Sequence, residues 1–338
     1  MIDNSKLDLL YKYDKPINWN VSCFGNDELM YDVISYIKYL DKHHIENPIK
    51  TVHGSYISKY GGGRPNYYIR NSNDIYDKIR EFNDLGIGVK MTFSNPYFTK
   101  EWLEEKELNE YLEVLSERKD LENGIICSID EFADYIHKKY PNLVVTSSYV
   151  KMANETRMGK TDTTDYYNKL FDLYDIVVMN TYRAFDDEFL DQIKYKDRIE
   201  FIVNNTCNVN CQIAHKHYEA MYEDIQRRKF LYENNLSLND PKLIIIRDKI
   251  NKVLDNCNKR RLTNNPNKLK YQQLYRNEIN HLLNKGINHF KLEGRDFDLY
   301  LFRFYIFRYI FNNESILVMV ANKHPFEIEQ DWKKHRIL

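Results

Sequence analysis

The segment from Asn204 to Cys211, which follows a predicted strand, combines two cysteines with histidines close behind. If a helix begins here, Cys207, Cys211 and His215 share one face, and thiols near a helix amino terminus ionise more readily. Soft thiolate ligands favour zinc or an iron–sulfur cluster. The spacing predicts a metal site, with two ordinary buried thiols and no cofactor as the alternative.

Other cysteines could complete such a ligand set. The chain has five in all, among them Cys257 in a polar stretch and Cys23 at the end of a predicted strand. An odd number spread through a long chain is unlike a secreted disulfide framework. We expect reduced thiols, with Cys23, Cys207, Cys211 and Cys257 as candidate metal ligands.

Polar residues also follow other predicted strands, at the positions where barrel enzymes place their active sites. His53 is a candidate general base, although a histidine at a strand end is more often a hydrogen-bonded core residue. The candidate substrate-binding residues of this kind are Asn95, Asn180, Arg183 and Asn204.

Two segments could bind an anion. Three glycines precede Arg64, so backbone N–H groups could lie beside its guanidinium, and a surface turn is the alternative. Glu293 and Arg295 follow the last predicted strand, where barrels often bind anions, and an ion pair between the two is the alternative. We assign Arg64 and Arg295 to substrate binding and Glu293 to proton transfer.

Eight short β-type runs, separated by amphipathic or polar stretches, must position these residues. The alternation of strands and helices predicts parallel pairing, and eight units predict a (β/α)8 TIM barrel rather than an open doubly wound sheet. The predicted strands are 17–24, 49–53, 88–93, 124–128, 143–147, 175–180, 199–204 and 288–292.

The helices are expected to follow each strand, as in the apolar stripe over residues 29–40, which begins after Asn26. We expect one domain over residues 1–338, with the barrel over about 17–296. The stretch 212–286 is too long for one barrel helix and predicts a helical insertion between strands 7 and 8. We expect residues 296–338 to form a C-terminal helical extension.

Charge and hydropathy limit the classes of partner. Lys and Arg total 49 against 50 Asp and Glu, so no overall basic field supports nucleic-acid binding. No apolar run reaches the roughly 20 residues that span a bilayer, and the first 15 residues contain no signal-type stretch. We expect a cytoplasmic protein that does not bind membranes and acts on a small molecule or nucleoside, with a protein partner or homo-oligomer left open.

Several of these motifs occur together in the same order as in a known family. His53-Gly54-Ser55, the glycines before Arg64, the Cys207–Cys211 pair and the ending Lys291 to Arg295 make the chain resemble the peptidase U32 family and its U32-like relatives. The resemblance implies a barrel enzyme. It also implies cysteines near the barrel mouth, which in several members hold a [4Fe-4S] cluster. Some members carry out oxygen-independent hydroxylation of RNA or quinone precursors, and others are named as collagenase-like proteases.

Three hypotheses follow. The first is a U32-like enzyme in which the cysteines hold a [4Fe-4S] cluster and a polar or anionic small molecule or nucleoside is modified. The second is a peptidase-like hydrolase in which Zn²⁺, bound by Cys207, Cys211 and His215, activates water. The third is a non-catalytic partner subunit on a degenerate barrel. Gln212 stands where the family commonly has proline, and the longer peptidase signature is absent.

Overall fold

The structure is a computed structural model. It describes residues 10–63, 70–157, 162–205, 211, 213–236, 240, 244, 247–253, 255–256, 273–294 and 297–311.

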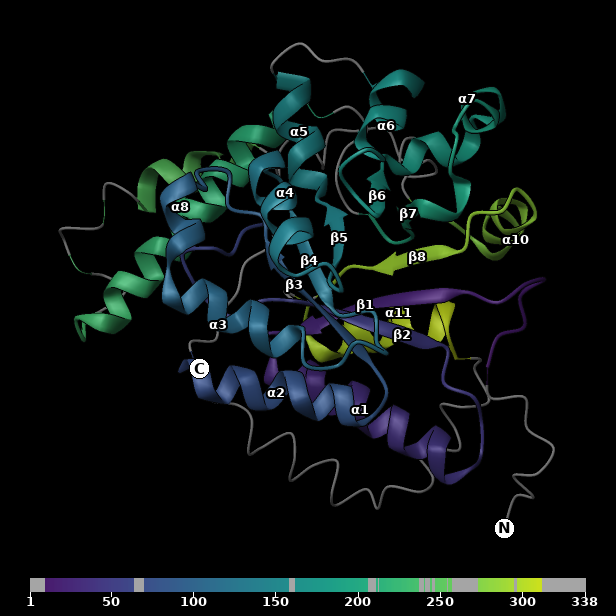
Figure 1. Cartoon of the computed structure of the whole chain (residues 1–338), viewed down its shortest axis with the longest axis horizontal. Helices are drawn as coiled ribbons and strands as arrows, with labels where there is room; N and C mark the ends of the chain where they lie inside the picture. Colours follow the sequence, from purple (N-terminus) through teal and green to yellow (C-terminus); the bar gives the residue numbers. More distant parts are fainter. Residues whose placement is uncertain are drawn as a thin grey trace.

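The fold is a closed barrel of eight parallel strands in chain order, which confirms the predicted (β/α)8 class (Figure 1). All eight predicted strands are present, with bounds that differ from the expected ones by no more than two residues. The strands are β1 Asn18–Phe24, β2 Ile49–Gly54, β3 Gly88–Phe93, β4 Gly124–Cys127, β5 Val144–Ser147, β6 Ile176–Met179, β7 Ile199–Ile202 and β8 His289–Leu292.

Helices surround the barrel and connect its strands. The α-helices are α1 Asp27–Lys42, α2 Ser72–Asp84, α3 Lys106–Leu115, α4 Asp130–Lys139, α5 Tyr149–Arg157, α6 Thr164–Leu170, α7 Asp187–Asp191, α8 Ala214–Glu233, α10 Arg276–Asn284 and α11 Leu299–Tyr309. Shorter 3-10 helices are η2 Lys100–Glu104, η3 Thr181–Phe185 and η4 Lys196–Arg198.

The first βα unit shows how the sequence sets these elements. Asn26 caps α1, because its side chain accepts a hydrogen bond from the Leu29 backbone N–H at 3.3 Å. The apolar face of α1 then packs on the outside of the barrel. Outward-facing side chains of the strands, such as Val21 and Val89, join it in one buried apolar layer. This layer holds the helices on the barrel and leaves the alternate strand positions to face inward.

The chain between β7 and β8 contains α8 and α10. Gln226 of α8 donates a hydrogen bond to the backbone oxygen of Ser58, after β2. Aromatic contacts join Tyr222 to Tyr97, which follows β3, and α8 packs on α5, which follows β5. Helix α8 therefore lies over the loops at the carboxyl ends of the strands.

Among the described helices, none has the length and apolar character that a membrane crossing requires.

Candidate active site

The interior of the barrel is filled by layers of side chains to which alternate strands contribute. The register of the eight strands places polar side chains in three successive layers, and all of these side chains are buried. From the amino end upward, the layers are Asn20, Lys90, Thr146 and Glu200, then His53, Ile126, Val178 and Lys291, then Ser22, Thr92, Ser148 and Ile202.

The lowest of these layers holds a buried ionic cluster. Glu200 is 1% exposed, and one of its carboxylate oxygens lies 3.7 Å from the ammonium of Lys291 in the layer above. Lys90, also 1% exposed, lies 3.6 Å from Glu122, just before β4. Burying three charges in a barrel interior costs free energy that only mutual pairing offsets.

The charge of Glu200 is maintained by its neighbours. Burial acts to raise the pKa of this carboxyl group. The positive charges of Lys291 and Lys90, with a hydrogen bond from Asn20, outweigh burial and hold the pKa of Glu200 below its ordinary value. Glu200 is therefore ionised inside the barrel.

His53 is connected to this cluster through Asn20. The Asn20 side-chain amide donates to Glu200 Oε1 at 2.9 Å. Its carbonyl oxygen Oδ1 lies 2.8 Å from His53 Nδ1. His53 itself is 4% exposed and belongs to the layer above, nearer the carboxyl ends of the strands. The structure thus places this predicted catalytic residue in a hydrogen-bonded chain that ends on a buried carboxylate.

Hydroxyl groups line the β3–β5 side of the interior. Among the residues that the structure describes, the hydroxyls of Thr92, Ser128 and Thr146 are buried without a hydrogen-bond partner. An unpaired buried hydroxyl costs about 1–3 kcal/mol. The interior is therefore more polar than folding alone requires.

Two of the predicted substrate-binding asparagines hold the barrel rim together. Asn204 donates to the backbone oxygen of Glu293 and accepts from its backbone N–H, both at 2.8 Å. These bonds join the carboxyl ends of β7 and β8 and leave Glu293 partly exposed at the mouth. Asn95 donates to the backbone oxygen of Lys59 at 2.6 Å and accepts from the Tyr97 N–H at 2.7 Å, so it links the loops after β2 and β3.

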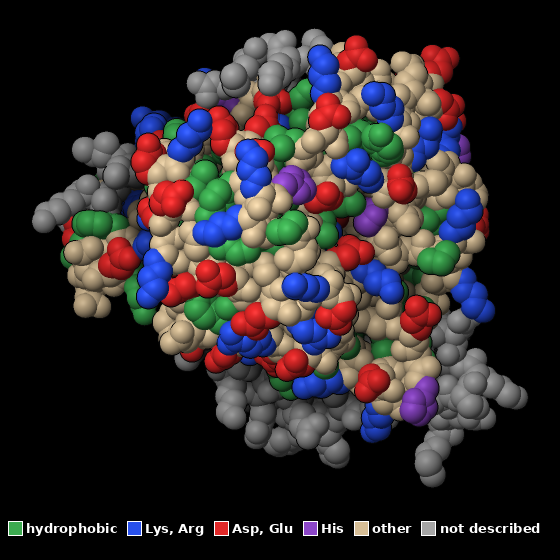
Figure 2. Space-filling view, in the orientation of Figure 1, with side chains coloured by type: hydrophobic (Ala, Val, Ile, Leu, Met, Phe, Trp, Pro, Cys, Tyr) green, Lys and Arg blue, Asp and Glu red, His purple; other side chains and the backbone are tan. Residues whose placement is uncertain are grey.

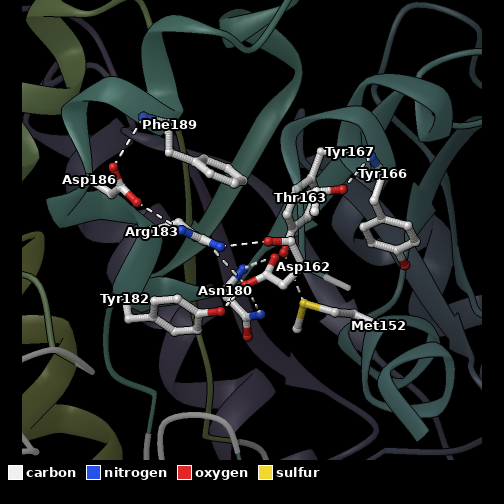
Figure 3. A network of polar contacts seen from close by, with 10 residues as sticks. All are labelled: Met152, Asp162, Thr163, Tyr166, Tyr167, Asn180, Tyr182, Arg183, Asp186 and Phe189. Atoms are coloured by element: carbon white, nitrogen blue, oxygen red, sulfur yellow. Dashed lines mark hydrogen bonds and ion pairs between the residues drawn. The ribbon is translucent and has the colours of Figure 1, made fainter. Parts of the chain in front are cut away.

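Asn180 and Arg183, after β6, contact one carboxylate (Figure 3). Asp162 Oδ2 accepts from Asn180 at 3.0 Å, from Arg183 Nε at 3.2 Å and from the hydroxyl of Tyr182. A second guanidinium nitrogen of Arg183 bonds Asp186 at 2.8 Å, and the guanidinium stacks 3.9 Å above the Phe189 ring. The two predicted ligand-binding side chains are thus brought together, with partners from the protein itself.

The cysteines are placed in different environments. Cys23 faces the apolar layer between β1 and the helices, and burial, with a smaller effect of Asp32, raises its pKa well above the ordinary value. Cys127, which was not among the predicted metal ligands, is also buried, and burial raises its pKa to about 12. Cys211 is half-buried just before α8. Among the described residues, no three His, Cys, Asp or Glu side chains are grouped so that they could hold a metal ion.

Four of the predicted site residues lie outside the described residues, namely Arg64, Cys207, Cys257 and Arg295.

Sequence reasoning missed Asn20, Lys90, Glu200 and Lys291. The predicted site residues lie at or after the ends of strands, whereas these side chains lie within strands. A signal was available, since Lys90 and Thr92 alternate with apolar residues along β3, as Asn20 and Ser22 do along β1. A polar period of two in a strand that is covered by helices on its outside indicates a polar interior.

The face of the molecule shown in Figure 2 has no large patch of a single charge sign. On the face shown in Figure 2, acidic and basic side chains are interspersed. This distribution agrees with the near balance of 49 basic and 50 acidic residues in the sequence.

No protein-family model matches the chain, and neither does any curated protein. Among solved structures, the chain is similar to one described as the U32 peptidase Mk0906. The two are 12% identical, with a TM-score of 0.45, over 84% of this chain and 96% of that chain. The chain is a closed (β/α)8 barrel with a likeness to a U32 peptidase structure.

Proposed function

We propose that the chain is an enzyme that modifies a small polar or anionic molecule, or a nucleoside, at the carboxyl ends of the barrel strands. The observation that carries this proposal is the chain of buried contacts from His53 through Asn20 to Glu200. Barrel interiors are usually packed with Val, Ile and Leu. Ionisable groups that are held in a polar interior at a cost in stability are typical of functional sites.

The proposed roles follow from position. His53 exchanges a proton with the substrate, because it lies one layer nearer the mouth than Glu200 and is connected to that carboxylate through Asn20. The ammonium of Lys291, in the same layer as His53, lies 3.7 Å from the Glu200 carboxylate in the layer below and helps to keep that group charged. Glu293 at the rim is a second group for proton transfer. Arg64 and Arg295 remain proposed anion-binding residues.

Replacing His53 with glutamine tests the role in proton transfer. We expect turnover to fall at least 100-fold, about the lower end of what general acid–base catalysis contributes. Because the substrate is unidentified, the purified protein is incubated with a small-molecule cell extract, and mass spectrometry follows which polar compounds are consumed over time.

The matched control is His281→Gln, which removes an exposed histidine paired with Asp187 outside the barrel. It should leave turnover unchanged. Equal turnover by wild type and His53→Gln would exclude His53 as the acid or base. A compound that binds stoichiometrically but is never consumed would favour the non-catalytic partner subunit.

A finer form of the proposal is an iron–sulfur enzyme of the hydroxylating type that the family resemblance implies. Cys207, Cys211 and Cys257 are the proposed ligands. The fourth candidate, Cys23, does not fit the ligand set, since it is buried in the apolar layer on the other side of β1. We therefore assign no step of the reaction to a cluster.

Metal content tests this finer form. After strictly anaerobic purification, wild type is expected to contain iron and acid-labile sulfide, and Cys211→Ser is expected to lose most of both, because a thiolate ligand is removed. Cys127→Ser is the control, since Cys127 is buried on the outer side of β4. Stoichiometric zinc without sulfide would favour the hydrolase instead. Absence of metal from anaerobically purified wild type would contradict both metal proposals.

A further inference from the structure

We infer that Asn20 and Glu200 are positioning residues that hold neutral His53 in the tautomer with its proton on Nδ1, so that Nε2 is the proton-accepting nitrogen. The inference rests on the proposed function only in giving His53 a proton to transfer. The tautomer itself follows from the contacts and can be measured without a substrate.

The orientation of the Asn20 amide decides which nitrogen carries the proton. An ionised carboxylate can only accept hydrogen bonds, so the group that Asn20 presents to Glu200 Oε1 at 2.9 Å must be its NH₂. The carbonyl oxygen of Asn20 then faces His53 Nδ1 at 2.8 Å. That oxygen can only accept, so His53 Nδ1 must donate.

The Nδ1–H tautomer depends on a charged Glu200, and the surroundings of Glu200 keep it charged. Lys291 and Lys90 supply two positive charges close to the carboxylate, and Glu200 is 1% exposed. Each member of the chain is buried, which fixes the geometry and strengthens each hydrogen bond relative to water.

The consequence for chemistry is a defined direction of proton transfer. In water, neutral histidine mainly carries its proton on Nε2, so the protein imposes the less common form. When Nε2 accepts a proton from a bound molecule, Nδ1 keeps its own proton and its bond to Asn20. The imidazolium formed is then stabilised by the carboxylate of Glu200, one side chain away.

Nitrogen-15 NMR of histidine-labelled protein tests the inference, because the two ring nitrogens of neutral histidine differ widely in chemical shift. Spectra are recorded at a pH of about 8.5, two units above the ordinary histidine pKa. The signal that disappears in His53→Gln is assigned to His53. We expect a protonated Nδ1 and an unprotonated Nε2. A wild-type signal with the proton mainly on Nε2 would overturn the inference.

Two variants separate the effect of Asn20 from a general loss of packing. Asn20→Leu should return His53 toward the mixture found in water, because Nδ1 loses its acceptor. The matched control is Asn83→Leu, which removes a buried amide that bonds Asn123 and the Ile87 backbone outside the barrel interior. It should leave the His53 signal in place. An equal change in both variants would contradict a specific role for Asn20.

Glu200→Gln provides a test that does not depend on Asn20→Leu folding. A glutamine side chain can donate as well as accept, so it no longer holds the Asn20 amide in one orientation, and part of His53 should shift to the Nε2–H tautomer. An unchanged His53 spectrum in this variant would show that Glu200 does not set the tautomer. The result is also distinct from the turnover test. If His53 of the wild type carries its proton on Nδ1 but His53→Gln retains full turnover, the tautomer assignment stands and the proposed function is rejected.

Discussion

Replacing Glu200 with leucine is expected to lower the free energy of unfolding by about 3–5 kcal/mol, the range typical of removing one partner from a buried ion pair. Leucine would remove the carboxylate that lies 3.7 Å from the Lys291 ammonium and that also attracts the charge of Lys90. It would also leave the Asn20 amide without its acceptor. Chemical denaturation followed by circular dichroism measures the change.

A double variant and a surface control make the prediction specific. Adding Lys291→Met to Glu200→Leu should recover part of the loss, because an apolar pair of similar volume replaces the broken ion pair. Glu122→Gln, which removes the partly exposed partner of Lys90, should cost no more than about 1 kcal/mol. If the free energy of unfolding of Glu200→Leu lies within about 1 kcal/mol of the wild-type value, the cluster does not stabilise the barrel.

Comparing wild type with Glu200→Leu also tests how stability depends on pH. Folding lowers the pKa of Glu200, so its contribution to stability is present above the unfolded-state value of about 4.3 and is lost as the pH falls through the folded-state pKa. Wild type should lose more stability than Glu200→Leu as the pH falls below about 4.

Replacing Gly54 with alanine is expected to destabilise the barrel by about 3 kcal/mol or more. A Cβ on Gly54 would lie 1.7 Å from the backbone oxygen of Phe24 and 2.7 Å from its carbonyl carbon. Both are backbone atoms of the neighbouring strand, so β1 and β2 would have to separate where they end. The backbone of Gly54, with φ at +152°, is also unfavourable for any other residue.

Gly86→Ala is the control for backbone conformation alone. Gly86, at the end of α2, has φ at +75°, and no atom lies within 4 Å of the position that a Cβ would take. We expect a cost of about 1–2 kcal/mol, from the left-handed conformation alone. Equal free energies of unfolding for the two alanine variants would show that the close approach of β1 and β2 has no effect on stability.

The strands could be predicted because their apolar runs are short and are separated by clear helical stripes. The run at 88–93 is recovered without change, and Asn26 caps the first helix as expected. These signals are local, since they depend on residues within one or two turns of each other.

The partners of the site residues could not be predicted in the same way. Asn204 bonds a residue 89 positions away, and Asn20 bonds one that is 180 positions away. A strand-end asparagine looks the same in the sequence whether it binds a ligand or joins two strands. The position of His53 was predicted, but its connection to Glu200 depends on barrel closure, which brings β1, β2 and β7 together.

The contact between the end of β7 and the segment that leads back to β8 determines how the length of the connection between them affects stability. Asn204 pairs with Gln273 in an antiparallel bridge, and the Leu274 N–H donates to the Val203 oxygen at 2.9 Å. The stretch between them leaves and re-enters the barrel at adjacent points. Doubling the length of a flexible closed loop costs only about 0.6 kcal/mol. A longer connection between these two points would therefore add little to the free energy that barrel closure costs.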